Sequence, residues 1–143
     1  MIELSDILIK PKDDVISVPP GTAVREAAKL LAEHQIGVVV VTDPDDGVCG
    51  ILSERDIASG VAEFGAQVAD KTVRELMTSS VISCTTSDSV VDILVLMEQH
   101  HVRHLPVIDD GALVGILSMR DVHSAWLDAL DRECEQLRGI KAA

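Results

Sequence analysis

An internal repeat constrains the fold of this chain more than any other feature of its sequence. Residues 50–56, Gly-Ile-Leu-Ser-Glu-Arg-Asp, recur at 115–121 as Gly-Ile-Leu-Ser-Met-Arg-Asp, so six of the seven positions are identical. Upstream, Val15-Ile16-Ser17 matches Val81-Ile82-Ser83, and residues 36–41 align with 102–107. A repeat of this kind is typical of a chain built from two copies of one supersecondary unit, each too small to bury its apolar face alone.

Each copy is predicted to fold as strand, helix, strand, strand, helix. An apolar stripe at helical spacing begins at Val24 in the first copy and at Val90 in the second, and two short apolar runs separated by an Asp/Gly turn follow it. The stripe indicates an amphipathic helix and the paired runs indicate a hairpin. We expect helix caps at Thr22 and Ser87, a connection between the copies at 60–71, and matching lead-in segments at 4–8 and 73–77.

These patterns predict an α+β protein with two tandem repeats, at residues 1–66 and 67–124, and a C-terminal helical extension at 125–143. Because neither half has much core of its own, we expect the two apolar sheets to pack against each other. The second helix of each copy follows the repeated Gly-Ile-Leu-Ser segment directly.

Charge and composition exclude several classes of function. The chain has 24 acidic and 12 basic residues, a formal charge of −12, and only one Phe, one Trp and no Tyr. This argues against nucleic-acid binding, which needs basic surface and is often helped by aromatic stacking. No apolar run is long enough for a membrane span, and the first residues do not resemble a secretion signal, so we expect a cytoplasmic protein. The three cysteines, far apart in sequence, are interpreted as free thiols.

The repeated Gly-Ile-Leu-Ser-x-x-Asp segments, together with Val102-Arg103-His104-Leu105-Pro106-Val107, resemble the tandem CBS-domain module over roughly residues 2–124. The first copy departs from this pattern by having Val40 where the second has Pro106. The resemblance implies a pseudo-twofold pair of repeats with two clefts, which in this family often bind AMP, ADP, ATP, NAD or S-adenosylmethionine. It also implies assembly of such pairs into dimers.

The two Ser-x-x-Asp segments, Ser53 to Asp56 and Ser118 to Asp121, allow two interpretations. Each can be a helix capping box, in which the hydroxyl accepts a backbone N–H and the acid bonds back to the capping residue. Alternatively, the hydroxyl and the free amides at the helix N-terminus bind a phosphate, while the carboxylate accepts the hydroxyls of a ribose. The intervening Arg55 and Arg120 either pair with the phosphates or lie in solvent.

The resemblance also implies which residues meet in each cleft, because the Ser-x-x-Asp segment of one copy faces the strands of the other. The first predicted cleft consists of Ser53, Arg55 and Asp56 with Ser83, Cys84, Thr85, Val102, Arg103, His104 and Pro106. The second consists of Ser118, Arg120 and Asp121 with Ser17, Val18, Pro19, Gly37, Val38 and Val39. This pairing brings Arg103 and His104 to Asp56 and predicts that the Asp56 cleft binds phosphorylated ligands more tightly.

Neither a metal site nor a catalytic centre is predicted. His100, His101 and His104 are close in sequence, but the first two end a helix, the third begins a strand, and nothing completes a ligand set. No Ser, Cys or His has a partner at a spacing that would make it a nucleophile. We therefore expect no enzyme, no metal and no catalytic cofactor.

Beyond the second copy the apolar stripe continues through Val122, Ala125, Trp126, Ala129, Leu130, Cys134 and Leu137. This helix can fold back on its own module, pack across a homodimer or bind a target protein. We expect a homodimer in which Trp126 is an anchor.

The sequence as a whole predicts a regulatory module that binds an adenine nucleotide (AMP, ADP, ATP or NAD), senses energy or redox state, and signals to a protein partner that the sequence does not identify. The alternative is a scaffold or dimerisation module with empty clefts.

Overall fold

The computed structural model describes residues 3–7 and 10–142 and divides into two compact units. The middle unit is Asp13–Val81, and the composite unit combines the chain up to Lys12 with Ile82–Ala143. Both mix helices with a three-stranded sheet, which confirms the predicted α+β class with two repeats and a C-terminal helix. The sheet-to-sheet packing of the two repeats stays a prediction.

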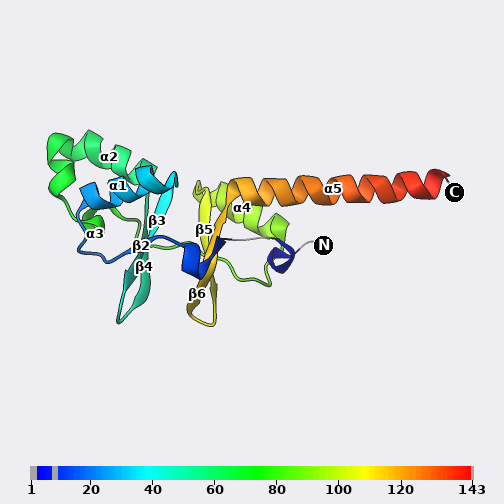
Figure 1. Cartoon of the computed structure of the whole chain (residues 1–143), viewed down its shortest axis with the longest axis horizontal. Helices are drawn as coiled ribbons and strands as arrows, with labels where there is room; N and C mark the ends of the chain where they lie inside the picture. Colours follow the sequence, from blue (N-terminus) through cyan, green and yellow to red (C-terminus); the bar gives the residue numbers. More distant parts are fainter. Residues whose placement is uncertain (1–2, 8–9, 143) are drawn as a thin grey trace. The chain divides into compact units, whose positions relative to one another are not determined.

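The middle unit contains β2 (Ser17–Val18), α1 (Val24–His34), β3 (Val38–Asp43), β4 (Gly47–Ser53) and α2 (Glu54–Phe64), followed by a 3-10 helix (Gly65–Asp70) and α3 (Val73–Leu76). Its sheet has the order β2-β3-β4, with β2 parallel and β4 antiparallel to β3 (Figure 1). Apolar side chains of α1 and α2 pack on Val39, Val41 and Leu52, so both helices share one core with the sheet.

The composite unit contains β1 (Lys10–Pro11), α4 (Val90–His100), β5 (His104–Asp109), β6 (Ala112–Ser118) and α5 (Met119–Ala142), with the sheet order β1-β6-β5. Its core gathers buried residues of α4 and the start of α5 around Leu105, Val107 and Leu117. The hairpins β3–β4 and β5–β6 confirm the predicted pairs of strands and their Asp/Gly turns. Gly47 and Gly111 have φ of 70° and 78° in these turns, a conformation that favours glycine.

Each lead-in segment packs with the other repeat, and not with the repeat that follows it in the sequence. Leu4 N–H donates to the Asp88 carbonyl at 2.9 Å, and β1 pairs with β6, so the first lead-in packs in the composite unit with the second repeat. Conversely, Val73 of the second lead-in donates its N–H to the Thr22 carbonyl at 2.7 Å and belongs to the core of the middle unit. The next residue after this lead-in, Thr78, exchanges backbone hydrogen bonds with Ile51 at 2.9 and 3.0 Å, so the second lead-in packs on the first repeat. Leu8 of the first lead-in lies outside the described residues. The compact units therefore divide the chain at other places than residue 66, because each lead-in completes the other repeat.

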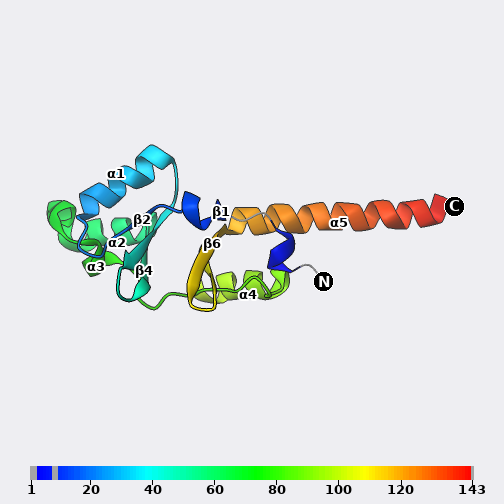
Figure 2. The same ribbon diagram turned by 60° about the horizontal axis from the view of Figure 1, so that its bottom comes forward.

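Both expected helix caps were wrong. Helix α1 is capped by Ala23 without a side-chain bond, and Ser89, rather than Ser87, caps α4 by accepting the Asp92 N–H at 3.1 Å. Residues 60–71, the expected connection between the copies, comprise the end of α2 and the 3-10 helix and belong to the middle unit. Helix α5 runs without interruption from the second repeat into the C-terminal extension, as the apolar stripe from Val122 predicted (Figures 1 and 2).

The close packing of α2 on α3 makes a first prediction about Gly60, which is buried in α2. A Cβ at Gly60 would lie 2.6 Å from Leu76 Cδ2 and 2.9 Å from Val68 Cγ2. We expect Gly60→Ala to lower the free energy of unfolding by about 1–3 kcal/mol through overpacking, although alanine is the better helix former by about 1 kcal/mol. Urea titration measures this change.

The matched control is Gly139→Ala in α5, where an added Cβ meets nothing within 4 Å. There the gain in helix propensity is unopposed, so the variant should be as stable as the wild type or slightly more stable. Equal effects of the two substitutions would show that α2 and α3 are not packed as described.

Candidate functional site

The junction of β4 and α2 forms a complete capping box. Asp56 Oδ2 accepts the Ser53 N–H at 2.9 Å and the Ser53 hydroxyl at 3.1 Å, and the Ser53 Oγ accepts the Asp56 N–H at 3.2 Å. The hydroxyl of Thr78 donates to the other carboxylate oxygen, Oδ1, at 3.4 Å. The capping interpretation is thus observed here, and both carboxylate oxygens of Asp56 already have a partner.

The junction of β6 and α5 forms only half of this arrangement. The Ser118 Oγ accepts the Asp121 N–H at 3.1 Å, as in the first copy. Within residues 3–7 and 10–142 no hydrogen bond runs from the Asp121 carboxylate back to the Ser118 amide, and no threonine matches Thr78. The carboxylate of Asp121 is therefore better placed than that of Asp56 to accept hydrogen bonds from a ligand.

The Ser-x-x-Asp spacing alone does not mark a site. Ser89 and Asp92 have it at the start of α4, and Thr72 and Glu75 form the analogous capping box at the start of α3. What distinguishes Ser53 and Ser118 is that each ends a sheet strand and begins a helix, so its hydroxyl lies beside the sheet at a helix N-terminus.

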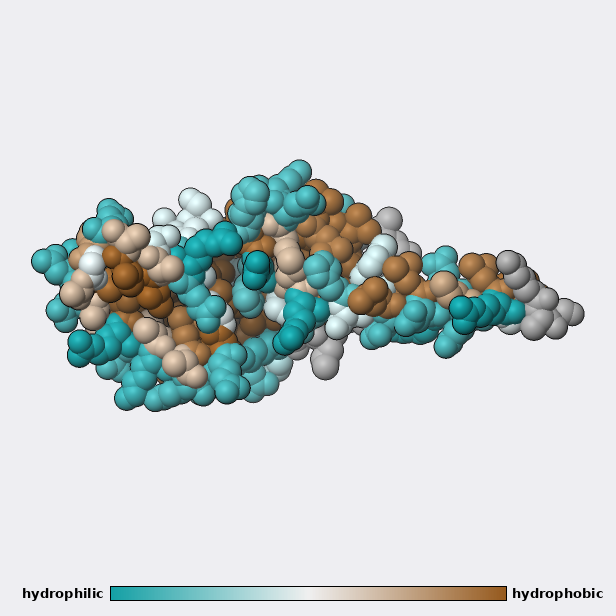
Figure 3. Space-filling view, turned by 90° about the horizontal axis from the view of Figure 1, so that it is seen from above, coloured by the Kyte–Doolittle hydropathy of each residue, from teal (hydrophilic) through white to brown (hydrophobic). Residues whose placement is uncertain are grey.

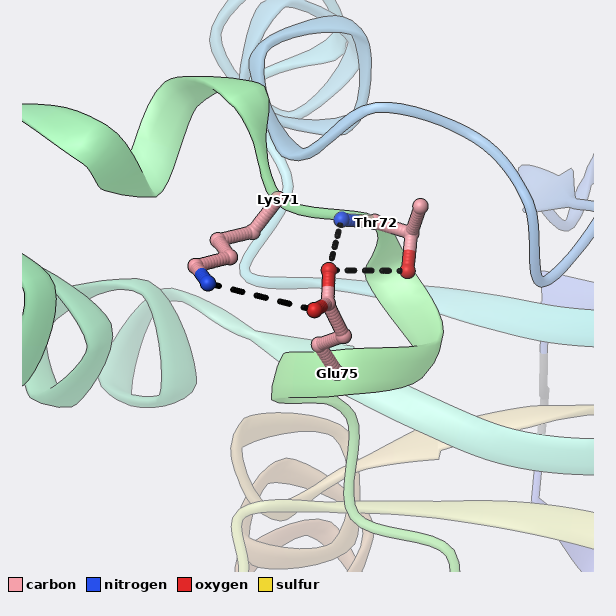
Figure 4. A network of polar contacts seen from close by, with 3 residues as sticks. All are labelled: Lys71, Thr72 and Glu75. Atoms are coloured by element: carbon pink, nitrogen blue, oxygen red, sulfur yellow. Dashed lines mark hydrogen bonds and ion pairs between the residues drawn. The ribbon is translucent and has the colours of Figure 1, made fainter.

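A polar network of Lys71, Thr72 and Glu75 holds the start of the second lead-in, which Thr78 directly follows (Figure 4). Glu75 accepts the Thr72 N–H at 2.7 Å and the Thr72 hydroxyl at 3.2 Å, and Lys71 Nζ lies 4.0 Å from the same carboxylate. The backbone hydrogen bond from Thr72 is the main cause that holds the pKa of Glu75 below its usual value. Sequence reasoning missed Thr72 and Thr78, although the Thr-x-x-Glu pattern was a readable signal for the first.

Within the middle unit, strand pairing places Gly37 and Val38 beside Ser53. Val38 faces Ser53 in the β3–β4 register, and the Gly37 carbonyl accepts the Glu54 N–H at 3.0 Å. Ser17 and Val18 pair with Val40 and Val41 farther along β3. Arg55 and Pro19 are exposed. Gly37, Val38 and Ser53 thus lie together at one end of the sheet, whereas Ser17 and Val18 lie along its β2 edge.

Within the composite unit, the same relation places Arg103 and His104 beside Ser118. His104 faces Ser118 in the β5–β6 register, and the Arg103 carbonyl accepts the Met119 N–H at 2.8 Å. The Arg103 side chain is exposed, as is that of Arg120. Strand pairing thus brings Arg103 and His104 to the Ser-x-x-Asp segment of their own repeat, and their predicted place in the Asp56 cleft stays a prediction.

The first strand of the second repeat is shorter than its counterpart. Cys84 N–H donates to the Pro106 carbonyl at 3.1 Å, and the Ile108 N–H donates to the Cys84 carbonyl at 2.8 Å. In the first repeat Val40 also donates its N–H to Ile16 at 3.1 Å, whereas Pro106 has no N–H to donate. The strand there is reduced to a bridge between Cys84 and Val107, with Ser83 and Thr85 exposed on either side.

The predicted apolar contacts lie on opposite faces of the two sheets. Val18, Val39 and Cys84 are buried in the cores of their own units, so only their main-chain groups can meet a ligand. Val38 and Pro106 are also buried, but each lies one residue from a core-facing side chain, and successive side chains of a strand point to opposite faces. Val102 packs half-buried on the core of the composite unit. The side chains of Val38 and Pro106 therefore point away from the cores of their own units.

Burial raises the pKa of the Cys84 thiol to about 12, and Asp88 and Asp109 contribute in the same direction. The pKa of an exposed thiol is lower, near 8.5. Cys84 therefore stays protonated in the folded protein and has no nucleophilic role at neutral pH. Its contribution to stability is fully present below the pKa of the unfolded state and is lost as the pH rises towards 12.

We expect thiol labelling at pH 8 to rank the cysteines by burial and pKa. Cys134 is exposed on α5 and should react at the rate of a free thiol, while Cys84 should react only after unfolding. Timed reaction with Ellman's reagent, followed by peptide mass analysis, measures this order, and Cys134→Ser should remove the fast phase. Rapid labelling of Cys84 in folded protein would contradict its placement in the core.

The described part of the chain contains no group of three His, Cys, Asp or Glu side chains placed to hold a metal ion. No described helix is long and apolar enough to cross a bilayer.

A family model described as the CBS domain matches residues 4–63 and again residues 73–128. The chain belongs to the CBS domain family. It is 36% identical over 130 residues to a 17.7 kDa protein of Acidianus ambivalens, a match that covers 87% of this chain and 77% of that protein. The plant protein CBSCBSPB1 of Arabidopsis thaliana is 29% identical, but this chain spans only 24% of its length.

Solved CBS structures share the fold. The CBS-domain containing protein ATU1752 from Agrobacterium tumefaciens is 40% identical, with a TM-score of 0.76 over 78% of this chain and 89% of that one. CBSX2, solved in complex with AMP, is 29% identical with a TM-score of 0.77. The CBS pair of protein MJ0100, solved with 5′-methylthioadenosine and S-adenosyl-L-methionine, is 28% identical with a TM-score of 0.78. Each of these two matches covers 90% of this chain and 98% of the other.

Proposed function

We propose that this CBS pair is a cytoplasmic, non-catalytic regulatory module that binds an adenine nucleotide, senses energy or redox state through it, and signals to a protein partner. CBS pairs in general are regulatory modules. The observation that carries the proposal is the repeated junction in which Ser53 and Ser118 each end a sheet strand and cap a helix, with an aspartate three residues on.

The chemistry of these junctions suits a nucleotide. A helix N-terminus has free N–H groups and the positive end of the helix dipole, which favour a phosphate. The aspartate carboxylate can accept both hydroxyls of a ribose, and Val38 and Pro106 offer apolar surface for the base. Adenosine compounds bound to CBSX2 and MJ0100 support this ligand class for the relatives. A binding experiment decides whether the ligand is AMP, ADP, ATP or NAD.

The predicted site residues remain a proposal in which each cleft uses both repeats. Arg103 and His104 lie beside Ser118, and Gly37 and Val38 lie beside Ser53. We therefore assign the two cations to the Ser118–Asp121 junction and change the predicted ranking of the sites accordingly. The first strands, at Ser17–Pro19 and Ser83–Thr85, complete the proposed contacts from the opposite repeat.

A thermal-shift panel with AMP, ADP, ATP, NAD and S-adenosylmethionine tests the proposal. A ligand that binds only the folded state at a hundredfold excess over its Kd stabilises it by about 2.7 kcal/mol, which raises the Tm by roughly 5–10 °C for a chain of this size. We expect a shift of this size for at least one compound. The variant with Asp56→Ala and Asp121→Ala together should lose it.

Asp92→Ala is the matched control, since Asp92 occupies the same position in the cap of α4 without lying at a sheet junction. It should keep the full shift. If none of the five compounds raises the Tm of folded wild-type protein, the alternative of a ligand-free scaffold is favoured. The complete capping box at Ser53 and Asp56 also fits that alternative.

We further propose that the module works as a homodimer. The apolar side chains exposed on α4 and α5, among them Val91, Val95 and Leu137, favour association. Light scattering at tens of micromolar protein should give twice the chain mass, and a monomer would contradict the proposal.

A further inference from the structure

The exchanged lead-ins place different residues at matching positions beside the two Ser-x-x-Asp junctions. In the middle unit, Thr78 forms an antiparallel bridge with Ile51, the isoleucine of the repeated Gly-Ile-Leu-Ser segment. In the composite unit, Lys10 of β1 pairs with Ile116, the matching isoleucine of β6 (Figure 2). Lys10 therefore occupies the register position that Thr78 occupies in the other unit.

The contact made by Thr78 shows what a side chain at this position can reach. Its hydroxyl donates to Asp56 Oδ1 at 3.4 Å, so even a short side chain opposite Ile51 extends to the aspartate of the junction. Ile51 and Ser53 lie on one face of β4, and the residue paired with Ile51 shares that face and is a diagonal neighbour of Ser53. The position is thus directed toward the N-terminus of the helix that follows the strand.

The same relation holds for Lys10 in the composite unit. Leu117 faces the core, so Ile116 and Ser118 lie on the opposite face of β6, and Lys10 shares that face as the partner of Ile116. Lys10 is half-buried, and no ion pair joins its ammonium to a carboxylate of the described residues. Lysine has a longer and more flexible stem than threonine, so its ammonium can reach the junction of Ser118 and Asp121 from β1.

A lysine at this junction matters because the charge of the chain as a whole disfavours an anion. The chain has 24 acidic and 12 basic residues, and hydrophilic residues are spread over both units in the view of Figure 3. At the start of α5 the free N–H groups and the helix dipole favour a phosphate, and an ammonium adds a charge-assisted hydrogen bond to it. The Asp56 junction has the uncharged Thr78 in the same place.

We propose that Lys10 binds the phosphate of an adenine nucleotide at the junction of Ser118 and Asp121. The inference rests on the proposed function and deepens it, because it assigns a phosphorylated ligand, rather than a nucleoside, to this junction. Lys10 is absent from the site residues expected from the sequence, since its place depends on the pairing of β1 with β6. The cation comes from the lead-in of the first repeat, whereas the junction belongs to the second.

Calorimetric titration with AMP and with adenosine tests this assignment. Asp56→Ala is the background, so that the Asp121 junction is the remaining site. Lys10→Met removes the charge and keeps the length of the side chain, and we expect AMP to bind about tenfold more weakly while adenosine binds as before. Lys12→Met is the matched control, because it removes the same charge from an exposed residue outside β1 and should leave both affinities unchanged.

Urea unfolding checks that Lys10→Met keeps the fold, and a second variant tests the same position in the other unit. Thr78→Lys, in an Asp121→Ala background, places the ammonium beside Asp56. We expect it to raise the preference for AMP over adenosine at that junction by about threefold or more. An unchanged preference would count against the register position as a source of phosphate contacts.

Equal weakening of AMP by Lys10→Met and Lys12→Met overturns the inference, because only the overall charge would then matter. Equal weakening of AMP and adenosine by Lys10→Met overturns it as well, because the lysine would then support the site without contacting the phosphate. In both cases the wild type still binds AMP, and the proposed function stands. Wild-type protein that binds neither compound overturns the proposed function and this inference together.

Discussion

Asp121→Ala is expected to remove the tighter of two nucleotide-binding events, while Asp56→Ala leaves that event in place. Asp121 has no hydrogen bond to its carboxylate among the described residues, and Arg103 and His104 lie beside Ser118 at the same junction. Asp56 is already bonded to Ser53 and Thr78. A hydrogen bond to a charged group contributes about 1.5–3 kcal/mol, so the loss should be tenfold to a hundredfold. Calorimetric titration of each variant measures it.

A double-mutant cycle connects the cation to the same site. If Arg103 and Asp121 contact one ligand, Arg103→Ala should weaken the tighter event in the wild type and have little further effect in Asp121→Ala. Coupling of Arg103 to Asp56 instead, or loss of the tighter event in Asp56→Ala, would reverse the ranking and support the pairing that the family resemblance implied. Asp92→Ala should behave as wild type.

Leu4→Ala is expected to destabilise the composite unit by about 2–5 kcal/mol, although residue 4 lies far in sequence from the second repeat. Leu4 is 1% exposed and belongs to the core formed by Val90, Ile93 and Leu117. Removing it leaves a cavity among residues of the second copy. Urea unfolding measures the loss, and hydrogen exchange should show the lost protection in 82–118 rather than in 13–81.

Ser5→Ala is the matched control, because the neighbouring Ser5 side chain is exposed and only its N–H bonds to Thr86. It should stay within about 0.5 kcal/mol of the wild type. A loss of protection in the middle unit of Leu4→Ala would show that the lead-in packs on its own repeat after all.

Hairpins and amphipathic helices could be predicted because their signals are local. The stripes beginning at Val24 and Val90 and the Asp/Gly turns determine elements through neighbouring residues, and α1, α4 and both hairpins confirm them. The exchange of lead-ins could not be predicted, because the pairing of Lys10 with Ile116 depends on contacts across a hundred residues. Two short segments of similar pattern give no indication of which sheet each will join.

The candidate site divides in the same way. The repeated Ser-x-x-Asp was visible in sequence, and the caps formed at Ser53 and Ser118. Both carboxylate oxygens of Asp56 accept hydrogen bonds, because Thr78, which the second lead-in brings to the first repeat, donates to one of them. Asp121 has no such threonine among the described residues. The register of β5 and β6 likewise determines that Arg103 and His104 lie beside Ser118. This register cannot be deduced from the spacing of the residues in the sequence.

The exchange of lead-ins has a consequence for synthesis on the ribosome. The middle unit is one continuous stretch, so it can fold as soon as Val81 has left the exit tunnel. Lys10 and Pro11 emerge before the middle unit, yet β1 pairs with Gly115 and Ile116, which are made about a hundred residues later. The nascent chain must therefore hold β1 unpaired while the whole middle unit is made, and the edge of β6 that β1 covers is closed only after that unit can fold.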